Sequence, residues 1–361
     1  MQKQKKIVLI GPMPKPINGV SICNELIAEK LKNFKVNTIN TAGKTFKEDL
    51  GKFSFQKFFS GIKPYIHLGK ILSSDIVYMT IGQTFFGVLK YFPFFITSKL
   101  LNKQIVVHIH GNYLGKQYSE LSGYKKNIFK NILKMSNKGI VLSENLRPNL
   151  TPFLSNKNIY VLYNFVEEIL YNLSENEIKN KKTDKLRIVF LSNLMTEKGI
   201  LDLLNALQIL YEKNIDFEAK LAGNIDLSIK KQVLDLIEQN PNVQYVGVVR
   251  GKAKKNLLLN ANTFVFPTYY TMEGQPIAIL EALVTGNIVL TTKHAGIPDI
   301  FSEKNGIFIQ KKSPDDIAEK LIKISQELNS YKPMMINNHS EAKKKYSEKE
   351  FLNKLAKIFN A

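Results

Sequence analysis

The order of apolar segments along this chain of 361 residues is the feature that most constrains its fold. Short, uninterrupted apolar runs, which are typical of buried strands, alternate with stretches that carry apolar residues at helical spacing. The predicted strands are residues 6–11, 36–40, 75–79, 104–110, 139–143 and 158–164, and then 186–192, 217–223, 243–247, 263–267, 287–291 and 306–310. Alternation of strands and helices predicts an α/β protein whose parallel sheets are covered by helices on both faces.

A polar segment separates these strands into two series of similar size. Residues 167–183 are mostly polar and charged, as is typical of a linker. We therefore predict two Rossmann-like domains that face a central cleft, one formed by residues 1–166 and the other by residues 167–340. Residues 341–361 have apolar side chains at helical spacing and are predicted to form a C-terminal helix that crosses back to the N-terminal domain.

Positive charge is concentrated in the first half of the chain. Residues 1–166 hold 24 basic and 7 acidic side chains, whereas residues 167–361 hold 27 and 24. A basic half indicates an anionic partner surface, either nucleic acid or an acidic membrane, although a compositional bias towards lysine would give the same numbers. No recognised nucleic-acid-binding module is visible, so no nucleic-acid partner is expected.

Cysteine and histidine usage argues against disulfides and metal ions. Cys23 is the only cysteine, which excludes an internal disulfide and a Cys-based zinc cluster and fits a reducing, cytoplasmic location. The five histidines show no metal-ligand spacing, so no metal is expected. The apolar start of the chain is interpreted as a first strand rather than a signal peptide. Residues 84–101 are interrupted by charged residues and a proline, which predicts a buried or interfacial helix rather than a membrane span.

The most informative segment is residues 267–300. A strand ends at Pro267, and a short loop leads to Pro276, which suits the first turn of a helix over residues 276–285. The N-terminus of that helix is predicted to point into the crevice at the carboxyl ends of the strands, where open α/β sheets bind ligands. Glu273 in the loop and Glu281 in the helix suit a hydroxyl-rich ligand, because each carboxylate accepts hydrogen bonds from a diol. The alternative is a solvated Glu273 and a Glu281 on the helix surface.

A second motif follows the first strand of the C-terminal series. Residues 191–207 are predicted to form a strand end, a loop and a helix, with Lys198 and a glycine at the start of the helix. A mobile cation beside free backbone N–H groups suits a diphosphate. The alternative is an ordinary exposed lysine.

Together these motifs resemble the donor-site signature of retaining family-4 glycosyltransferases of the GT-B fold. The matching residues are Pro267, Thr268, Glu273, Gly274, the run from Pro276 to Glu281 and Ala282, Gly286 and Gly296. The resemblance is nearest to members that build bacterial capsule, exopolysaccharide or lipopolysaccharide O-antigen. It implies that Glu273 contacts the donor sugar and that Glu281 binds the ribose hydroxyls. It also implies that the backbone of Gly274, Gln275 and Pro276 lines the sugar and phosphate pocket.

The same resemblance assigns roles to other positions. Lys198 would neutralise the leaving diphosphate together with an arginine of a Gly-Arg pair, but this chain has Ser192 and Asn193 at that pair, so one expected cation is missing. His110 matches a position near the C6 hydroxyl of the donor sugar, the alternative being a core histidine. Asn18 and Gly19 would form the acceptor or phosphate loop. Ser143, Glu144 and Asn164 also match family positions, without a defined role.

The function implied is that of a metal-independent hexosyltransferase without a cofactor. A nucleotide-diphosphate sugar, with UDP the better choice on family frequency, would donate its sugar to a polyprenyl-diphosphate-linked or saccharide acceptor. The alternative is a non-catalytic GT-B protein that binds a nucleotide sugar and regulates a partner.

Two basic and aromatic segments predict peripheral association with the anionic inner face of the cell membrane. The predicted contact residues are Lys52, Phe55, Lys57, Phe58, Lys126, Lys130 and Lys134. The alternative is a core-facing apolar stripe with a solvated lysine face.

Overall fold

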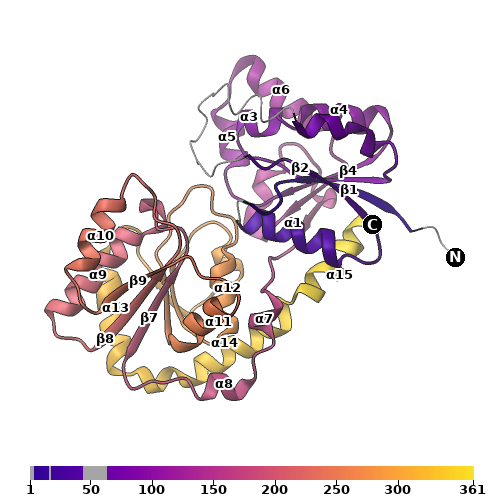
Figure 1. The fold of residues 1–361 in the computed structure, drawn as a ribbon. Coiled ribbons are helices and arrows are strands. Elements are labelled where there is room, and N and C mark those ends of the chain that lie inside the picture. Colours follow the sequence, from indigo (N-terminus) through magenta and orange to yellow (C-terminus); the bar gives the residue numbers. More distant parts are fainter. Residues whose placement is uncertain (1–3, 16–17, 44–62) are drawn as a thin grey trace. The chain divides into compact units, whose positions relative to one another are not determined.

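A computed structural model describes residues 4–15, 18–43 and 63–361. The chain divides into two compact units, which are described separately (Figure 1). Unit 1 contains the chain up to Asn164 together with Met272–Gln275 and Lys349–Ala361. Unit 2 contains Phe165–Thr271 and Pro276–Glu348.

Unit 1 is built on a parallel sheet of six strands in the order β2-β1-β3-β4-β5-β6. The strands are β1 (Lys6–Gly11), β2 (Lys35–Asn40), β3 (Ile76–Thr80), β4 (Gln104–Ile109), β5 (Lys138–Val141) and β6 (Ile159–Val161). The inner strands are buried on both faces, which explains their continuous apolar sequences. The strand order changes direction between β1 and β3, and the chain leaves both strands at the same edge of the sheet.

Helices cover both faces of this sheet. They are α1 (Gly19–Lys30), α3 (Phe85–Leu89), α4 (Phe92–Leu100), α5 (Leu114–Glu120), α6 (Gly123–Leu133) and α15 (Glu348–Asn360), with 3-10 turns η1 (Lys63–Ile71), η2 (Glu144–Asn149) and η3 (Asn156–Asn158). In Figure 1, α1 and α15 lie on one side of the sheet, and α3, α4 and α6 lie on the other. Phe359 of α15 packs edge-to-face on Tyr78 of β3, with ring centroids 5.5 Å apart. Within the described residues no helix has the length and apolarity needed to cross a membrane.

Unit 2 contains a second parallel sheet, in the order β12-β11-β10-β7-β8-β9. Its strands are β7 (Leu186–Leu191), β8 (Phe217–Ala222), β9 (Val243–Gly247), β10 (Thr263–Phe266), β11 (Ile288–Thr292) and β12 (Gly306–Ile309). This is the Rossmann order, with the topological switch point between β7 and β10. The prediction of two successive parallel α/β sheets is therefore confirmed.

Helices cover this sheet on both faces as well. They are α7 (Glu168–Tyr171), α8 (Glu175–Lys179), α9 (Ile200–Glu212), α10 (Lys230–Glu238), α11 (Gly251–Asn260), α12 (Ile277–Val284), α13 (Pro314–Gln326) and α14 (Lys332–Lys345), with 3-10 turns η4 (Thr196–Lys198), η5 (Ile297–Asp299) and η6 (Leu328–Tyr331). Figure 1 shows α9, α10 and α13 on one side and α11, α12 and α14 on the other.

The end of the chain differs from the prediction of one helix over residues 341–361. It forms the end of α14 and then α15, with a break at Tyr346 and Ser347. The break has a local cause, because the Tyr346 carbonyl accepts a hydrogen bond from the Val166 N–H at 2.8 Å, and Val166 forms a parallel bridge with Ser347. Backbone groups used in this way do not continue a helix. Helix α14 lies in unit 2, and Lys349 begins the part of α15 that lies in unit 1.

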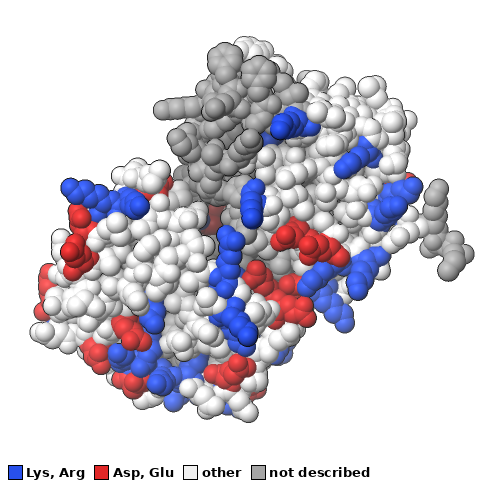
Figure 2. All heavy atoms as spheres, viewed as in Figure 1, with Lys and Arg blue, Asp and Glu red and all other residues white. Residues whose placement is uncertain are grey.

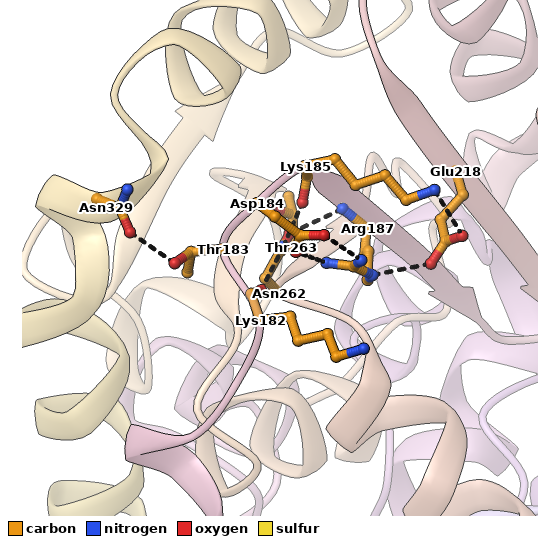
Figure 3. Close-up of polar contacts among 9 residues, drawn as sticks. All are labelled: Lys182, Thr183, Asp184, Lys185, Arg187, Glu218, Asn262, Thr263 and Asn329. Atoms are coloured by element: carbon orange, nitrogen blue, oxygen red, sulfur yellow. Dashed lines mark hydrogen bonds and ion pairs between the residues drawn. The ribbon is translucent and has the colours of Figure 1, made fainter.

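A cluster of polar side chains connects the amino ends of β7 and β8 through hydrogen bonds and ion pairs (Figure 3). The Arg187 guanidinium contacts the Asp184 carboxylate at 2.9 Å and the Glu218 carboxylate at 3.0 Å. The Asn262 side chain accepts from the Arg187 N–H and donates to the carbonyls of Lys182 and Lys185. Arg187 therefore lies at the amino ends of the strands, away from the carboxyl-end crevice, and does not replace the missing family arginine.

Candidate functional site

The loops that follow β7 and β10 meet at the switch point of unit 2. The Tyr269 N–H donates to the Glu197 carbonyl at 2.8 Å, which joins the two loops. Gly199, the N-cap of α9, has a φ of 78°, and a Cβ there would lie 2.4 Å from the Pro267 carbonyl oxygen. Only glycine fits this left-handed conformation and close approach without strain.

Lys198 holds a positive charge at this point, beside the N-terminus of α9. The side chain is half-buried, and its Nζ lies 4.7 Å from the centre of the Tyr270 ring and 5.4 Å from that of Phe266. Such contacts with aromatic faces orient an ammonium group. The alternative interpretation, an ordinary exposed lysine, does not describe this half-buried side chain.

Other basic side chains surround the same loop. The Lys312 Nζ lies 4.9 Å from the centre of the Tyr269 ring. A ring nitrogen of His294 lies 2.7 Å from the Tyr270 carbonyl oxygen, and the Lys311 Nζ lies 3.2 Å from the other ring nitrogen. Lys198, Lys311 and Lys312 therefore lie near the carboxyl edge of the sheet at β7 and β10, together with the carboxylates of Glu197 and Asp202.

Ser192 and Asn193 lie at the carboxyl end of β7 and are half-buried. Gly223, which follows β8, is packed against them, because a Cβ there would lie 1.8 Å from the Ser192 carbonyl oxygen. The structure therefore places the two residues at the sheet edge that also carries Lys198, but their side chains are neutral.

Glu281 is a buried residue of α12 and not the helix-surface carboxylate of the alternative interpretation. The Lys254 Nζ lies 2.5 Å from the Glu281 carboxylate and 2.6 Å from that of Glu167. Burial opposes the charge on Lys254, but the two carboxylates outweigh it, so the pKa of Lys254 is raised. Pro276 is the N-cap of α12 rather than its first residue. Lys254 was not predicted as a partner of Glu281, because α11 and α12 are separate in sequence and meet only in the fold.

Glu273, Gly274 and Gln275 belong to a segment that packs on unit 1. Gln275 is buried, donates to the Leu142 carbonyl at 2.9 Å and accepts from the Asn164 N–H at 2.7 Å. The Asn164 side chain donates to the Gln275 carbonyl at 2.8 Å. Glu273 is buried, with 8% of its surface exposed. Asn164, which matched the family without a defined role, thus holds the segment in place.

Gly274 packs closely against the residue that follows β4. A Cβ on Gly274 would lie 2.5 Å from the His110 carbonyl oxygen. The structure therefore brings two of the predicted site residues, Gly274 and His110, next to each other within unit 1.

We expect Gln275→Ala to destabilise the Met272–Gln275 segment by more than the small area of this side chain alone would predict. The change removes the partners of a buried N–H and a buried carbonyl, each of which costs about 1–3 kcal/mol when left unpaired. The melting temperature of the variant and its kcat and KM for sugar transfer measure the effect. Gln244→Ala, at an exposed residue of β9, is the matched control. Equal effects of the two changes would contradict the role of Gln275.

His110 follows β4 and stacks near His108, with ring centroids 4.0 Å apart. Burial lowers the pKa of His110 to about 3, so the imidazole is neutral at physiological pH. Within the described residues, the Nε2 atoms of both rings are buried without a hydrogen-bond partner. One potential ligand atom from each of Cys23, His108 and His110 lies within 4.8 Å of the others. Sequence spacing does not reveal this cluster, because α1 and β4 are far apart in the chain.

Asn18 and Gly19 form the start of α1. The Asn18 side chain accepts from the Ser21 N–H at 2.9 Å, and Ser21 in return accepts from the Asn18 N–H. Asn18 is therefore a helix cap, and its side-chain oxygen already has a partner.

The predicted membrane contacts are only partly described. Lys52, Phe55, Lys57 and Phe58 lie outside the described residues. Lys126 and Lys130 lie on α6, and Lys134 follows it, while Phe129, Ile132 and Leu133 of the same segment are buried. The core-facing interpretation thus holds for these three apolar residues. Helices α3, α4 and α6 carry an exposed apolar set, namely Phe86, Phe92, Ile96, Leu100, Tyr124 and Ile128. Tyr124 and Ile128 lie in the segment 124–138 that was predicted to contact the membrane, whereas the other four were not predicted as contacts.

Comparisons with known proteins agree with this architecture. Residues 173–341 match the family model of glycosyl transferases group 1. The capsular polysaccharide biosynthesis glycosyltransferase CapM of Staphylococcus aureus is 24% identical over 61% of this chain and 60% of its own length. An uncharacterized glycosyltransferase of Methanocaldococcus jannaschii is 23% identical over 73% of this chain and 70% of its own length.

Solved structures share the fold over nearly the whole chain. Anabaena HepE in complex with UDP-glucose superposes with a TM-score of 0.74 at 14% identity, covering 98% of this chain and 99% of HepE. Sucrose-phosphate synthase from Thermosynechococcus elongatus superposes with a TM-score of 0.75 at 14% identity, covering 99% of this chain and 98% of the synthase. At these identities the likeness establishes the fold, and both sheets of this chain take part in it.

Proposed function

We propose that this protein is a retaining glycosyltransferase of surface polysaccharide synthesis. Residues 173–341 match the family model of glycosyl transferases group 1, which supports the proposal. The protein would move a hexosyl group from a UDP-sugar to a lipid-linked or saccharide acceptor. The observation that carries the proposal is the placement of the Lys198 ammonium at the switch point of unit 2, beside the N-terminus of α9. The CapM relative and the UDP-glucose complex of HepE favour this substrate class.

Lys198 and the N-terminus of α9 would stabilise the leaving diphosphate. Charge develops on that group as the anomeric C–O bond breaks, and a preorganised cation aimed at it lowers the barrier. The acceptor oxygen forms the new bond on the same face of the sugar, and its proton passes to the departing phosphate oxygen. No enzyme carboxylate is required as a nucleophile, and protein cations take the place of a metal ion.

Glu281 would bind the ribose hydroxyls. Lys254 contacts one carboxylate oxygen of Glu281, so the second oxygen is assigned to the ribose. His110 would contact the sugar as a neutral hydrogen-bonding group. Glu273 and the backbone of Gly274 and Gln275 would complete the sugar contacts.

A panel of nucleotide sugars tests the proposal. We expect thermal stabilisation by UDP and by one or a few UDP-sugars, followed by UDP release when an acceptor is supplied. Stabilisation without any release or transfer would instead favour the non-catalytic, regulatory alternative. No response to any nucleotide sugar would contradict both.

We also propose that unit 1 binds the inner membrane surface, where a polyprenyl-linked acceptor resides. Three helices of this unit carry exposed apolar side chains, and Phe92, Ile96 and Leu100 recur at every fourth residue of α4. Lys125 and Lys126 of α6 add positive charge. Figure 2 shows both basic and acidic side chains on the visible face of each unit, with acidic side chains of unit 1 over α1.

Flotation with anionic vesicles tests the membrane surface. The pair of changes Ile96→Glu and Leu100→Glu is expected to abolish flotation, because it places two carboxylates against anionic lipid. Replacing Lys126, Lys130 and Lys134 by glutamine is expected to weaken binding by about 100-fold, at about 1 kcal/mol for each cation. Leu227→Glu, at an exposed leucine of unit 2, is the control. Equal flotation of all variants, or none by the wild type, would contradict the proposal.

A further inference from the structure

Cys23, His108 and His110 place three metal-ligating side chains together in the interior of unit 1. Potential ligand atoms of the three lie within 4.8 Å of one another. His108 and His110 are two residues apart at the end of β4, so their rings project from the same side of the sheet. Cys23 comes from α1, which covers that side.

One ring nitrogen of each histidine in this cluster forms no hydrogen bond within the described residues. Cys23 and His108 have no exposed surface, and within the described part of the chain the Nε2 atoms of both histidines lack a hydrogen-bond partner. Buried polar atoms are normally paired, so two unpaired ring nitrogens beside a thiol require an explanation. His110 is only half-buried as a residue, which gives the cluster a side nearer to solvent.

We propose that this cluster binds one copper(I) ion through Cys23 Sγ, His108 Nε2 and His110 Nε2. Thiolate and imidazole are the ligands that copper(I) and zinc prefer. The charge balance selects copper(I). The ion displaces the thiol proton to solvent, the S–H bond is replaced by an S–Cu bond, and the net charge of the site does not change. A zinc ion would add one uncompensated positive charge in a buried place, and it would also require a fourth ligand.

Tyr78 provides a hydrogen-bond partner for a ligating histidine of this site. Its hydroxyl oxygen lies 2.6 Å from Nδ1 of His108. When Nδ1 carries the proton and donates it to that hydroxyl oxygen, the Nε2 lone pair is available to the ion. Partners of this kind fix the tautomer of a ligating histidine, and their loss typically lowers metal affinity by about 10- to 100-fold. Tyr78 is thus a positioning residue of the site.

Anaerobic titration of the full chain with copper(I), against a competing copper(I) chelator, tests the proposal. We expect one ion per chain, one proton released per ion, and an X-ray absorption spectrum with one sulfur and two nitrogen ligands. Cys23→Ala is expected to lower the affinity by at least about 100-fold, His110→Ala similarly, and Tyr78→Phe by about 10- to 100-fold. His67→Gln, at an exposed histidine of unit 1, should leave the affinity unchanged.

Folding of each variant is checked by circular dichroism, and Cys23→Ser serves as a second cysteine variant. Absence of a stoichiometric ion, or binding that persists without Cys23, would overturn the proposal. Tighter binding of zinc than of copper(I) would overturn the choice of ion. His110 is also assigned to the sugar in the proposed transferase, but none of these measurements uses sugar transfer, so failure of the copper site and failure of the transferase activity are distinguishable.

Discussion

Lys198→Ala is expected to lower kcat for sugar transfer by about 10²- to 10³-fold. This is the usual cost of removing one preorganised group that stabilises charge in a transition state, about 3–4 kcal/mol. The loss should appear in kcat, because the charge on the diphosphate grows as the bond to the sugar breaks. Initial rates of UDP release with a saturating donor measure it.

The matched control is Lys213→Ala, at an exposed lysine that follows α9 in the same unit. This variant should retain wild-type turnover. The melting temperature of Lys198→Ala should stay close to that of the wild type, because Lys198 is half-buried and contributes mainly contacts with two aromatic rings. A well-folded Lys198→Ala protein with near-normal turnover would remove the proposed role of this residue.

Lys254→Met is expected to lower the free energy of unfolding of unit 2 by about 3–5 kcal/mol. The change leaves the Glu281 carboxylate buried without its cation and also removes the partner of Glu167. Denaturant titration followed by circular dichroism measures the loss. Because Glu281 is assigned to the ribose, weaker UDP binding should accompany it.

Two further variants distinguish the loss of a buried ion pair from the general effect of removing a lysine. Lys255→Met, at the next residue of α11, breaks a half-exposed pair with Glu177 and should cost less than about 1 kcal/mol. Adding Glu281→Gln to Lys254→Met should recover part of the stability, because it removes a buried charge. A similar loss for Lys254→Met and Lys255→Met would contradict the account of this pair.

The fold was predictable because the strands are buried on both faces. Each central strand, such as β3, is a continuous apolar run that is recognisable without knowledge of its neighbours. The break between α14 and α15 was not predictable, because it depends on the pairing of Tyr346 with Val166, which is distant in sequence. Periodicity reports which face of a helix is apolar, but it does not report such a long-range backbone contact.

The candidate site was predictable where chain order alone determines position. Lys198 follows β7, and the carboxyl end of that strand lies at the switch point in any sheet of this order. Partners that come from different elements were missed. Lys254 meets Glu281 only after α11 and α12 have packed, and Cys23 meets His108 only after α1 has covered β4.

A crystal structure of the protein with UDP bound tests the central claim most directly. The account predicts the diphosphate at the carboxyl ends of β7 and β10, within ion-pair distance of the Lys198 Nζ and against the first turn of α9, with the ribose on Glu281. UDP bound elsewhere on unit 2, with Lys198 turned away from its phosphates, would contradict it.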